Sequence, residues 1–156
     1  MCTSSQTTDY ILSKIDTQAG ETISPLKLQK LLYYCQAWHL TIFNKCLFKE
    51  KIEAWAHGPV VPSQYARFAG IFREDAIKIN NINLVLPNLK KETKELLDEV
   101  LSIYGEHSAG YLETLTHKEI PWCNARGNLK PYEKSTNEIT HKSMIDYYSA
   151  FKKNGK

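Results

Sequence analysis

Residues 25–44 constrain the fold more than any other part of the sequence. Ser24 is a favourable N-cap and Pro25 a favourable first residue of a helix. Apolar and small side chains then recur at helical spacing, and neighbouring aromatic residues widen the apolar surface. The remaining polar face is narrow and consists of Lys27, Lys30 and Thr41. Because a helix that is apolar on most sides is buried, we expect a central helix here. Its predicted core residues are Leu28, Leu31, Leu32, Tyr34, Gln36 and Trp38.

The length and composition are those of one soluble domain. The 156 residues are 42% hydrophobic and 24% charged, close to the globular average. A chain of this length buries enough surface to fold without disulfides or a metal. No run of about 18 apolar residues occurs, and the N-terminus lacks the pattern of a signal peptide. No C-x-x-C pair occurs among the cysteines, which is typical of reduced thiols, so we expect a cytoplasmic protein without membrane contact.

Helical periodicity predicts shorter helices around the central one. They are expected over residues 8–20, 62–70 and 89–104, and after the capping residues Ser108 and Thr140. Residues 124–137 are typical of a loop. Both ends of the chain are polar, and no linker divides it. We therefore expect a single domain over residues 8–151, with flexible tails at 1–7 and 152–156.

Residues 52–57 alternate as in a half-buried strand, with Glu53, Trp55 and His57 on one side. Residues 46–48 are a candidate partner strand. Residues 77–86 alternate weakly in two pieces, which fits either a hairpin or an extended loop. The predicted fold class is therefore mainly α with a small antiparallel β-sheet, a single compact α+β domain.

One group of residues has the chemistry of a zinc site. Cys35 and His39 are four residues apart on the central helix, and Cys46 and His57 follow. The last two lack the tight spacing of a zinc motif. The first two also lie on the apolar stripe, where thiols and core histidines are common. We therefore expect neither a metal nor a cofactor.

Catalytic alternatives also have weak support in the sequence. Cys123 with His117 or His57 has the composition of a thiol nucleophile and its base, but no hydrolase signature surrounds it. Glu50 and Glu53 are three residues apart, so on a strand they point to opposite faces and do not form an acid–base pair. We expect no enzyme activity and assign no catalytic residue.

The sequence gives little support to nucleic-acid binding. It contains no glycine-rich phosphate loop, and its net charge is only +3. The candidate contacts to phosphate are few, namely Lys27, Lys30, Arg67 and Arg73. We therefore expect no direct contact with nucleic acid.

A rigid turn flanked by aromatic residues is the best candidate for a partner-binding surface. Trp55 and Tyr65 flank residues 58–62, which contain two prolines. Prolines limit the freedom of the free chain, so ordering such a turn on binding costs less. Trp and Tyr are common anchors of protein interfaces.

These motifs resemble the Panacea domain family, which includes SocA-like antitoxins and GepA-type phage-associated proteins. Residues 25–39 (PLKLQKLLYYCQAWH) are similar to the first signature of that family, and residues 52–65 (IEAWAHGPVVPSQY) to the second. Residues 115–117, followed by Pro121-Trp122, resemble the third. Cys35 replaces the small residue expected there and fills a similar volume.

The resemblance implies a cytoplasmic bacterial antitoxin, from a toxin–antitoxin or prophage-borne system, that binds a cognate toxin protein. It also implies two alternatives: an adaptor that delivers the toxin to a ClpXP-type protease, and a phage inhibitor of another host protein. An enzyme pocket built from His57, His117 and Glu53 is a further alternative. On the first interpretation the three signatures converge on one binding platform. Its candidate residues are Trp55, His57, Gly58, Pro59, Val60, Pro62, Tyr65, His117 and Trp122.

Overall fold

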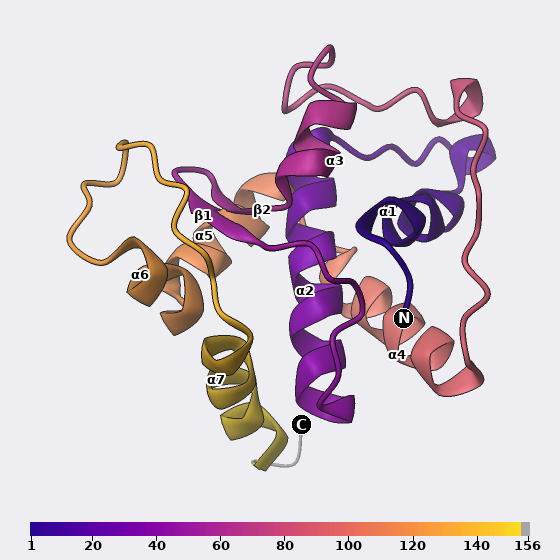
Figure 1. Cartoon of the computed structure of the whole chain (residues 1–156). Coiled ribbons are helices and arrows are strands. Elements are labelled where there is room, and N and C mark those ends of the chain that lie inside the picture. The colour runs from indigo at the N-terminus through magenta and orange to yellow at the C-terminus, as the bar shows by residue number, and fades with distance from the viewer. Residues whose placement is uncertain (154–156) are drawn as a thin grey trace.

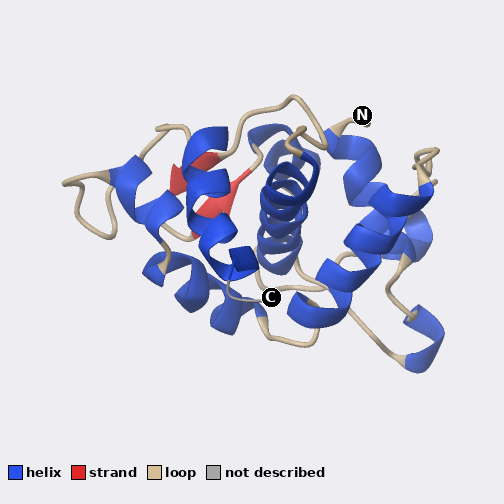
Figure 2. Ribbon diagram, turned by 90° about the horizontal axis from the view of Figure 1, so that it is seen from below, coloured by secondary structure: helices blue, strands red, loops and turns tan. Residues whose placement is uncertain are grey.

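Helix α2 (Pro25–Phe43) runs through the middle of the molecule in the computed structural model, which describes residues 1–153 (Figure 1). Seen nearly end-on, it lies between the strands on one side and a helical layer on the other (Figure 2). The elements around it in the described range are α1 (Ser4–Ser13), η1 (Thr17–Ala19), β1 (Glu53–Trp55), β2 (Gly58–Val60), α3 (Pro62–Arg67), η2 (Ile79–Asn81), α4 (Lys91–Tyr104), α5 (Ala109–Lys118), α6 (Ile120–Arg126) and α7 (His141–Lys153). This arrangement confirms the predicted fold class: mainly helical, with one small antiparallel sheet in a single domain.

Helix α2 forms where the sequence predicts it. The Ser24 hydroxyl accepts a hydrogen bond from the Lys27 N–H at 3.2 Å, and Pro25 occupies the first turn. The helix ends at Asn44, whose φ of 54° is left-handed. Its predicted core residues are buried except Trp38, which is partly buried and donates its indole N–H to the Tyr104 hydroxyl. The central position of α2 follows from this burial, because α1, α4, α5 and α7 all pack on it.

The first helix begins earlier than predicted. Thr3 and Gln6 form a capping box, so α1 starts at Ser4 and not after Thr8. Ser4 is fully buried, and its N–H donates to a Glu50 carboxylate oxygen at 3.0 Å. Residues 4–7, which the sequence assigned to a flexible tail, therefore belong to the domain. At the other end Lys152 lies within α7, and residues 154–156 of the expected tail lie outside the described residues.

The sheet pairs different segments from those predicted. β1 pairs with β2 in antiparallel register, with Ala54 opposite Pro59, and the segment 46–48 is not a strand. The reason is Gln36, whose amide accepts from the Leu47 N–H and donates to the Phe48 carbonyl, each at 2.7 Å. A buried side chain thus satisfies the backbone groups that a strand would have paired. The other edge of β1 meets residues 137–139, which exchange backbone hydrogen bonds with residues 52–54.

The structure decides one open prediction and corrects another. Of the two alternatives for residues 77–86 it has the loop and not the hairpin, because their backbone groups bond elsewhere: the Ile77 N–H to the Ile23 carbonyl and the Val85 N–H to the Asp9 carboxylate, both at 2.8 Å. The loop predicted at 124–137 begins only after α6, a helix that the sequence did not predict. Pro121 lies in the first turn of α6, where proline is favoured rather than disruptive.

Candidate functional site

The β-hairpin is the centre of the candidate site, and its turn requires glycine. Residues 56–57 connect the strands, and Gly58 follows with a φ of +108°. A Cβ at this position would lie 2.6 Å from Cε of Lys30 and 3.1 Å from the Thr116 hydroxyl. Gly58 is therefore needed both for its conformation and for the close approach of the turn to α2 and α5.

Two polar residues of α2 hold the second strand. The Gln29 side chain accepts a hydrogen bond from the Val61 N–H at 2.8 Å. The Lys30 ammonium donates to the Pro59 carbonyl at 3.3 Å. Lys30 is 0% exposed, so its assignment to a polar helix face is wrong. The turn at Gly58-Pro59 covers that face, which the helical pattern alone does not reveal.

The third motif holds the hairpin from the opposite side. The Trp122 indole donates to the Trp55 carbonyl at 2.8 Å, and the His117 ring stacks on Trp122 with centroids 4.1 Å apart. Arg126 donates to the Ala54 carbonyl at 3.0 Å. The three motifs therefore converge on the hairpin, as the sequence predicts.

The same guanidinium of Arg126 also fixes the loop that follows α6. Its Nη2 atom donates to the carbonyls of Lys130 and Glu133, at 2.7 and 2.8 Å. The group lies over the Trp122 ring and is almost fully buried. Arg126 was absent from the predicted site, because a side chain that contacts only backbone carbonyls leaves no pattern in the sequence.

Aromatic residues form the exposed side of the hairpin. The rings of Trp55 and Tyr65 meet edge to face with centroids 4.8 Å apart. Tyr65 is 48% exposed, while Trp55 is partly buried and donates its indole N–H to Glu53 at 2.9 Å. Val60, Pro59 and Gly58 are buried beneath, and Pro62 starts α3. The aromatic candidates thus combine an exposed Tyr65 with a partly buried Trp55, above a buried turn.

The two histidines of the site have separate surroundings. His57 is exposed, and its Nδ1 lies 3.3 Å from a carboxylate oxygen of Glu113. His117 is partly buried, which lowers its pKa, and its Nε2 has no hydrogen-bond partner within the described residues. Glu53 binds Trp55 instead of either histidine. The carboxylate beside His57 is therefore that of Glu113 on α5, which is not among the predicted site residues.

The residues of the alternative zinc and thiol sites do not lie together. Cys35 is buried in the core, and burial raises the pKa of its thiol well above the ordinary value. His39 is held by the Lys45 carbonyl at 2.6 Å. Cys123 is exposed and contacts only the backbone carbonyl of His117, at 3.1 Å. Across residues 1–153 no three His, Cys, Asp or Glu side chains gather where they could hold a metal ion.

The candidate phosphate contacts are dispersed. Lys27 donates to the Gly105 carbonyl at 2.6 Å, and Arg67 pairs with Asp9 at 2.7 Å. Lys30 is buried, which leaves Arg73 as the exposed member of the predicted set. In the described part of the chain, no helix has the length and hydropathy needed to span a membrane.

Burial of Lys30 makes stability depend on pH. Desolvation lowers the pKa of its amine to about 7, against an ordinary value of 10.5. Between these values the unfolded chain binds the proton and the folded chain does not, so stability rises with pH across this window and falls as pH is lowered through it. We expect the free energy of unfolding, relative to Lys30→Met, to rise by about 1.4 kcal/mol per pH unit.

Urea unfolding of both proteins at pH 7, 8 and 9 measures this difference. The comparison with Lys30→Met cancels the titration of all other groups. A difference that does not change with pH would show that the Lys30 amine stays charged in the folded protein.

Comparisons with known proteins give one match. The family model described as "Antitoxin SocA-like, Panacea domain" matches residues 28–123, more than half of the chain. The matched range includes all but the first three residues of α2, the hairpin and the Trp122 motif. Searches of the curated proteins and of the solved structures gave no match.

Proposed function

Since the chain belongs to the SocA-like Panacea antitoxin family, we propose that it is an antitoxin that neutralises a toxin protein by binding it directly. One observation carries this proposal beyond the family match. The first and third motifs hold the hairpin of the second motif and leave the Trp55–Tyr65 pair on its outer side. A rigid surface with exposed aromatic anchors is well suited to protein binding, because little entropy is lost when it binds.

Direct binding makes a stoichiometric prediction. A binder inactivates one toxin molecule per antitoxin molecule, whereas an enzyme or a proteolytic adaptor acts on many. The proposed mechanism requires no catalytic residue, and the histidines and Trp122 act in it as structural supports of the hairpin. A ClpXP-type adaptor and an enzyme remain as outcomes of the test.

The test uses the gene product encoded beside this chain. We expect it to arrest growth when expressed alone, to be tolerated with this protein, and to co-purify with it as a one-to-one complex. Rescue without a complex, together with a falling level of the neighbour, would support proteolytic delivery. Rescue without a complex at an unchanged level would support chemical reversal. A harmless neighbour that forms no complex would contradict the antitoxin proposal.

Replacing Tyr65 tests the aromatic surface directly. We expect Tyr65→Ala to weaken toxin binding by about tenfold or more, because truncation of a central aromatic anchor typically costs at least 1–2 kcal/mol. Tyr111→Ala is the matched control, since Tyr111 is 51% exposed against 48% for Tyr65 but lies on α5. Isothermal titration gives both affinities. Equal affinities for the two variants would place the toxin on another surface.

A further inference from the structure

A groove lies beside the hairpin and extends the candidate surface. Its cavity volume is about 650 Å³, within the usual range of about 300–1,000 Å³ for binding pockets. It is formed by the first turns of α2, the hairpin, α3 and the segments 71–73 and 134–136. We call it the α2–α3 groove. The Leu26 N–H donates to the Arg73 carbonyl at 3.0 Å and fixes one wall. Arg126 fixes the segment before the other wall through the Glu133 carbonyl.

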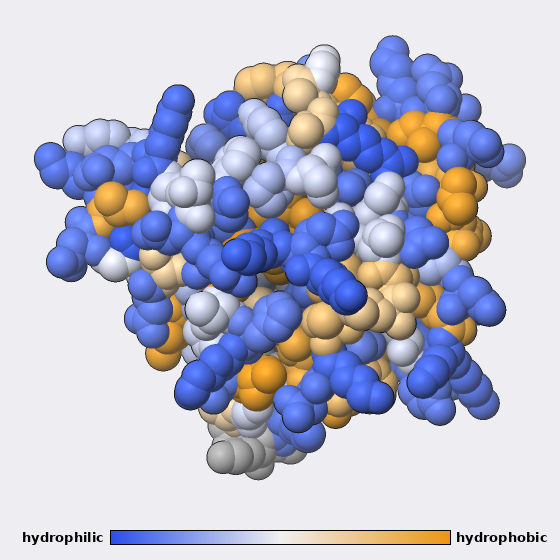
Figure 3. Space-filling view, in the orientation of Figure 1, coloured by the Kyte–Doolittle hydropathy of each residue, from blue (hydrophilic) through white to orange (hydrophobic). Residues whose placement is uncertain are grey.

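The walls of the α2–α3 groove are apolar and partly open to solvent. Its aromatic lining residues are Trp55, Tyr65, Phe68 and Phe72. Phe72 is 54% exposed and Tyr65 48%, so two large rings at the same cavity remain uncovered. Hydrophobic atoms gather at the top of the molecule, over the end of α3 (Figure 3). Uncovered apolar surface next to a cavity marks an interaction site more reliably than isolated exposed residues do.

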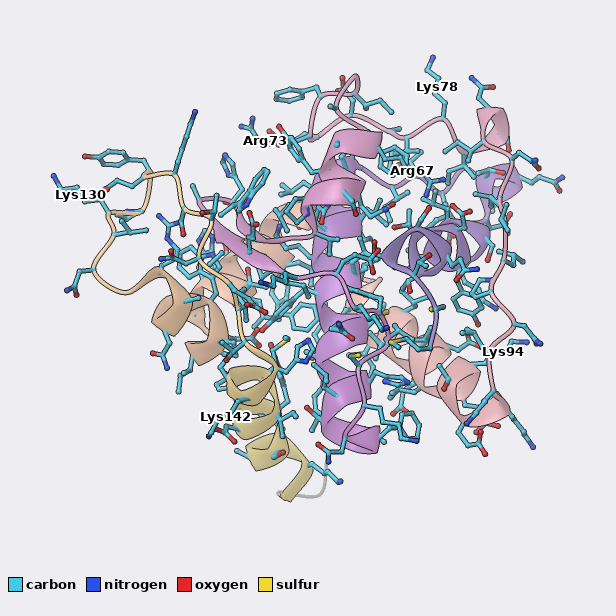
Figure 4. All side chains as sticks on the ribbon, viewed as in Figure 1. Arg67, Arg73, Lys78, Lys94, Lys130 and Lys142 are labelled. Atoms are coloured by element: carbon cyan, nitrogen blue, oxygen red, sulfur yellow. The ribbon has the colours of Figure 1, made fainter. Side chains whose placement is uncertain are left out.

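The charged residues that line the groove are all basic. Arg73 and Lys134 contribute exposed cations, Lys30 a buried amine and His57 an imidazole, and among the described residues no Asp or Glu lines the groove. The Lys30 amine lies beneath the hairpin, whereas Arg73 and Lys134 are exposed. Figure 4 shows Arg73 beside the end of α3, away from Lys94 and Lys142. Within the described residues Arg73 forms one ion pair, an exposed contact of 3.8 Å with Glu74, and pairs of that kind contribute little.

We propose that the α2–α3 groove binds a segment of the toxin in which aromatic or aliphatic side chains alternate with carboxylates. The apolar side chain packs among Trp55, Tyr65 and Phe72, and the carboxylates accept hydrogen bonds from Arg73 and Lys134 at the rim. The identity of the partner as the toxin rests on the proposed function. The chemistry of the segment rests on the groove alone, because a basic rim around an apolar cavity is complementary to acidic and apolar groups together.

Other occupants fit the groove less well. A second copy of this chain carries a net charge of +3 and would bring like charges together. Nucleic acid binds through many phosphate contacts, and this groove offers two exposed cations. An acidic and apolar protein segment satisfies both the charges and the aromatic walls.

A pair of synthetic peptides tests the chemistry of the groove. The first is fluorescein-labelled Gly-Ser-Asp-Phe-Asp-Leu-Ser-Gly, and the second has Lys in place of both Asp. We expect the acidic peptide to bind at least about tenfold more tightly by fluorescence anisotropy. Equal binding of the two peptides would overturn the proposal. So would the absence of binding by the acidic peptide up to roughly 1 mM protein, the weakest affinity that such a contact gives.

Charge reversal locates the bound peptide. We expect the Arg73→Glu/Lys134→Glu double variant to bind the acidic peptide about tenfold more weakly, or weaker still. The matched control is Lys94→Glu with Lys142→Glu, which makes the same change of charge on α4 and α7, and it should change the affinity by less than about twofold. Equal losses in both double variants would assign the binding to net charge and overturn the groove. Circular dichroism confirms that each variant is folded.

The same variants separate this inference from the proposed function. If the wild-type protein rescues growth and forms the complex, and the Arg73→Glu/Lys134→Glu variant does so with equal affinity, the groove proposal fails and the antitoxin proposal stands. If the neighbouring gene product is harmless and forms no complex while the acidic peptide still binds, the antitoxin proposal fails and the groove binds acidic segments of another protein. Competition between the toxin and the peptide supports both proposals.

Discussion

Gly58→Ala should lower the free energy of unfolding by about 4 kcal/mol. A left-handed backbone costs a non-glycine residue about 1–2 kcal/mol, and the φ of +108° at Gly58 is in that region. The new methyl group would also overlap Cε of Lys30 at 2.6 Å. Overpacking of this kind costs a further 1–3 kcal/mol, roughly, because the turn cannot move away without breaking its hydrogen bonds.

Two other glycines separate the cost of backbone strain from the cost of overpacking. Gly20 has a φ of +85° and open space at its Cβ, so Gly20→Ala reports the backbone strain alone. Gly110 has neither constraint and lies in α5, where alanine should stabilise by about 0.5–1 kcal/mol. Urea denaturation of the three variants gives the comparison. A loss at Gly58 no larger than the loss at Gly20 would show that the approach of Lys30 to the turn is not tight.

Arg126→Met should lower the free energy of unfolding by about 3 kcal/mol. Its guanidinium donates to four backbone carbonyls from two segments, and methionine removes all of these hydrogen bonds. Methionine preserves most of the apolar contact of the side chain with Trp122, so the loss measures the hydrogen bonds. The loop after α6 should open as well, because Arg126 alone contacts both its Lys130 and its Glu133 carbonyl.

Urea denaturation and limited trypsin digestion check this expectation. Cleavage after Lys134 should accelerate in Arg126→Met and stay unchanged in Arg73→Met, which removes an exposed guanidinium. Surface changes of that kind alter stability by no more than about 0.5 kcal/mol. Equal stabilities of the two variants would show that solvent replaces the buried hydrogen bonds of Arg126 without cost.

Local signals were enough to predict the central helix. Ser24 and Pro25 start it, the apolar periodicity requires its burial, and both features act within a few residues of the chain. The convergence of the three motifs was also predictable, through the family resemblance. Pro121 in the first turn is a local signal for the start of α6, but the sequence analysis predicts no helix there.

Long-range hydrogen bonds explain most of the remaining differences. The Gln36 side chain bonds the Leu47 N–H and the Phe48 carbonyl, which a partner strand would otherwise have paired. A hydropathy pattern does not show whether a side chain or a strand will satisfy these groups. Lys30 looked like a solvated residue because the turn that covers it comes 28 residues later in the chain. The aromatic pair was predictable from residue type, whereas the basic rim of the α2–α3 groove required three segments to be placed together.

The polar side chains of α2 also determine the order in which the molecule assembles. A hairpin of two three-residue strands is at best marginally stable alone, and this one is fixed by Gln29 and Lys30 from one side and by Trp122 and Arg126 from the other. Its contacts therefore form only after distant parts of the chain have met, late on the folding pathway. A partner that binds there would slow hydrogen exchange across the hairpin and raise the melting temperature by mass action.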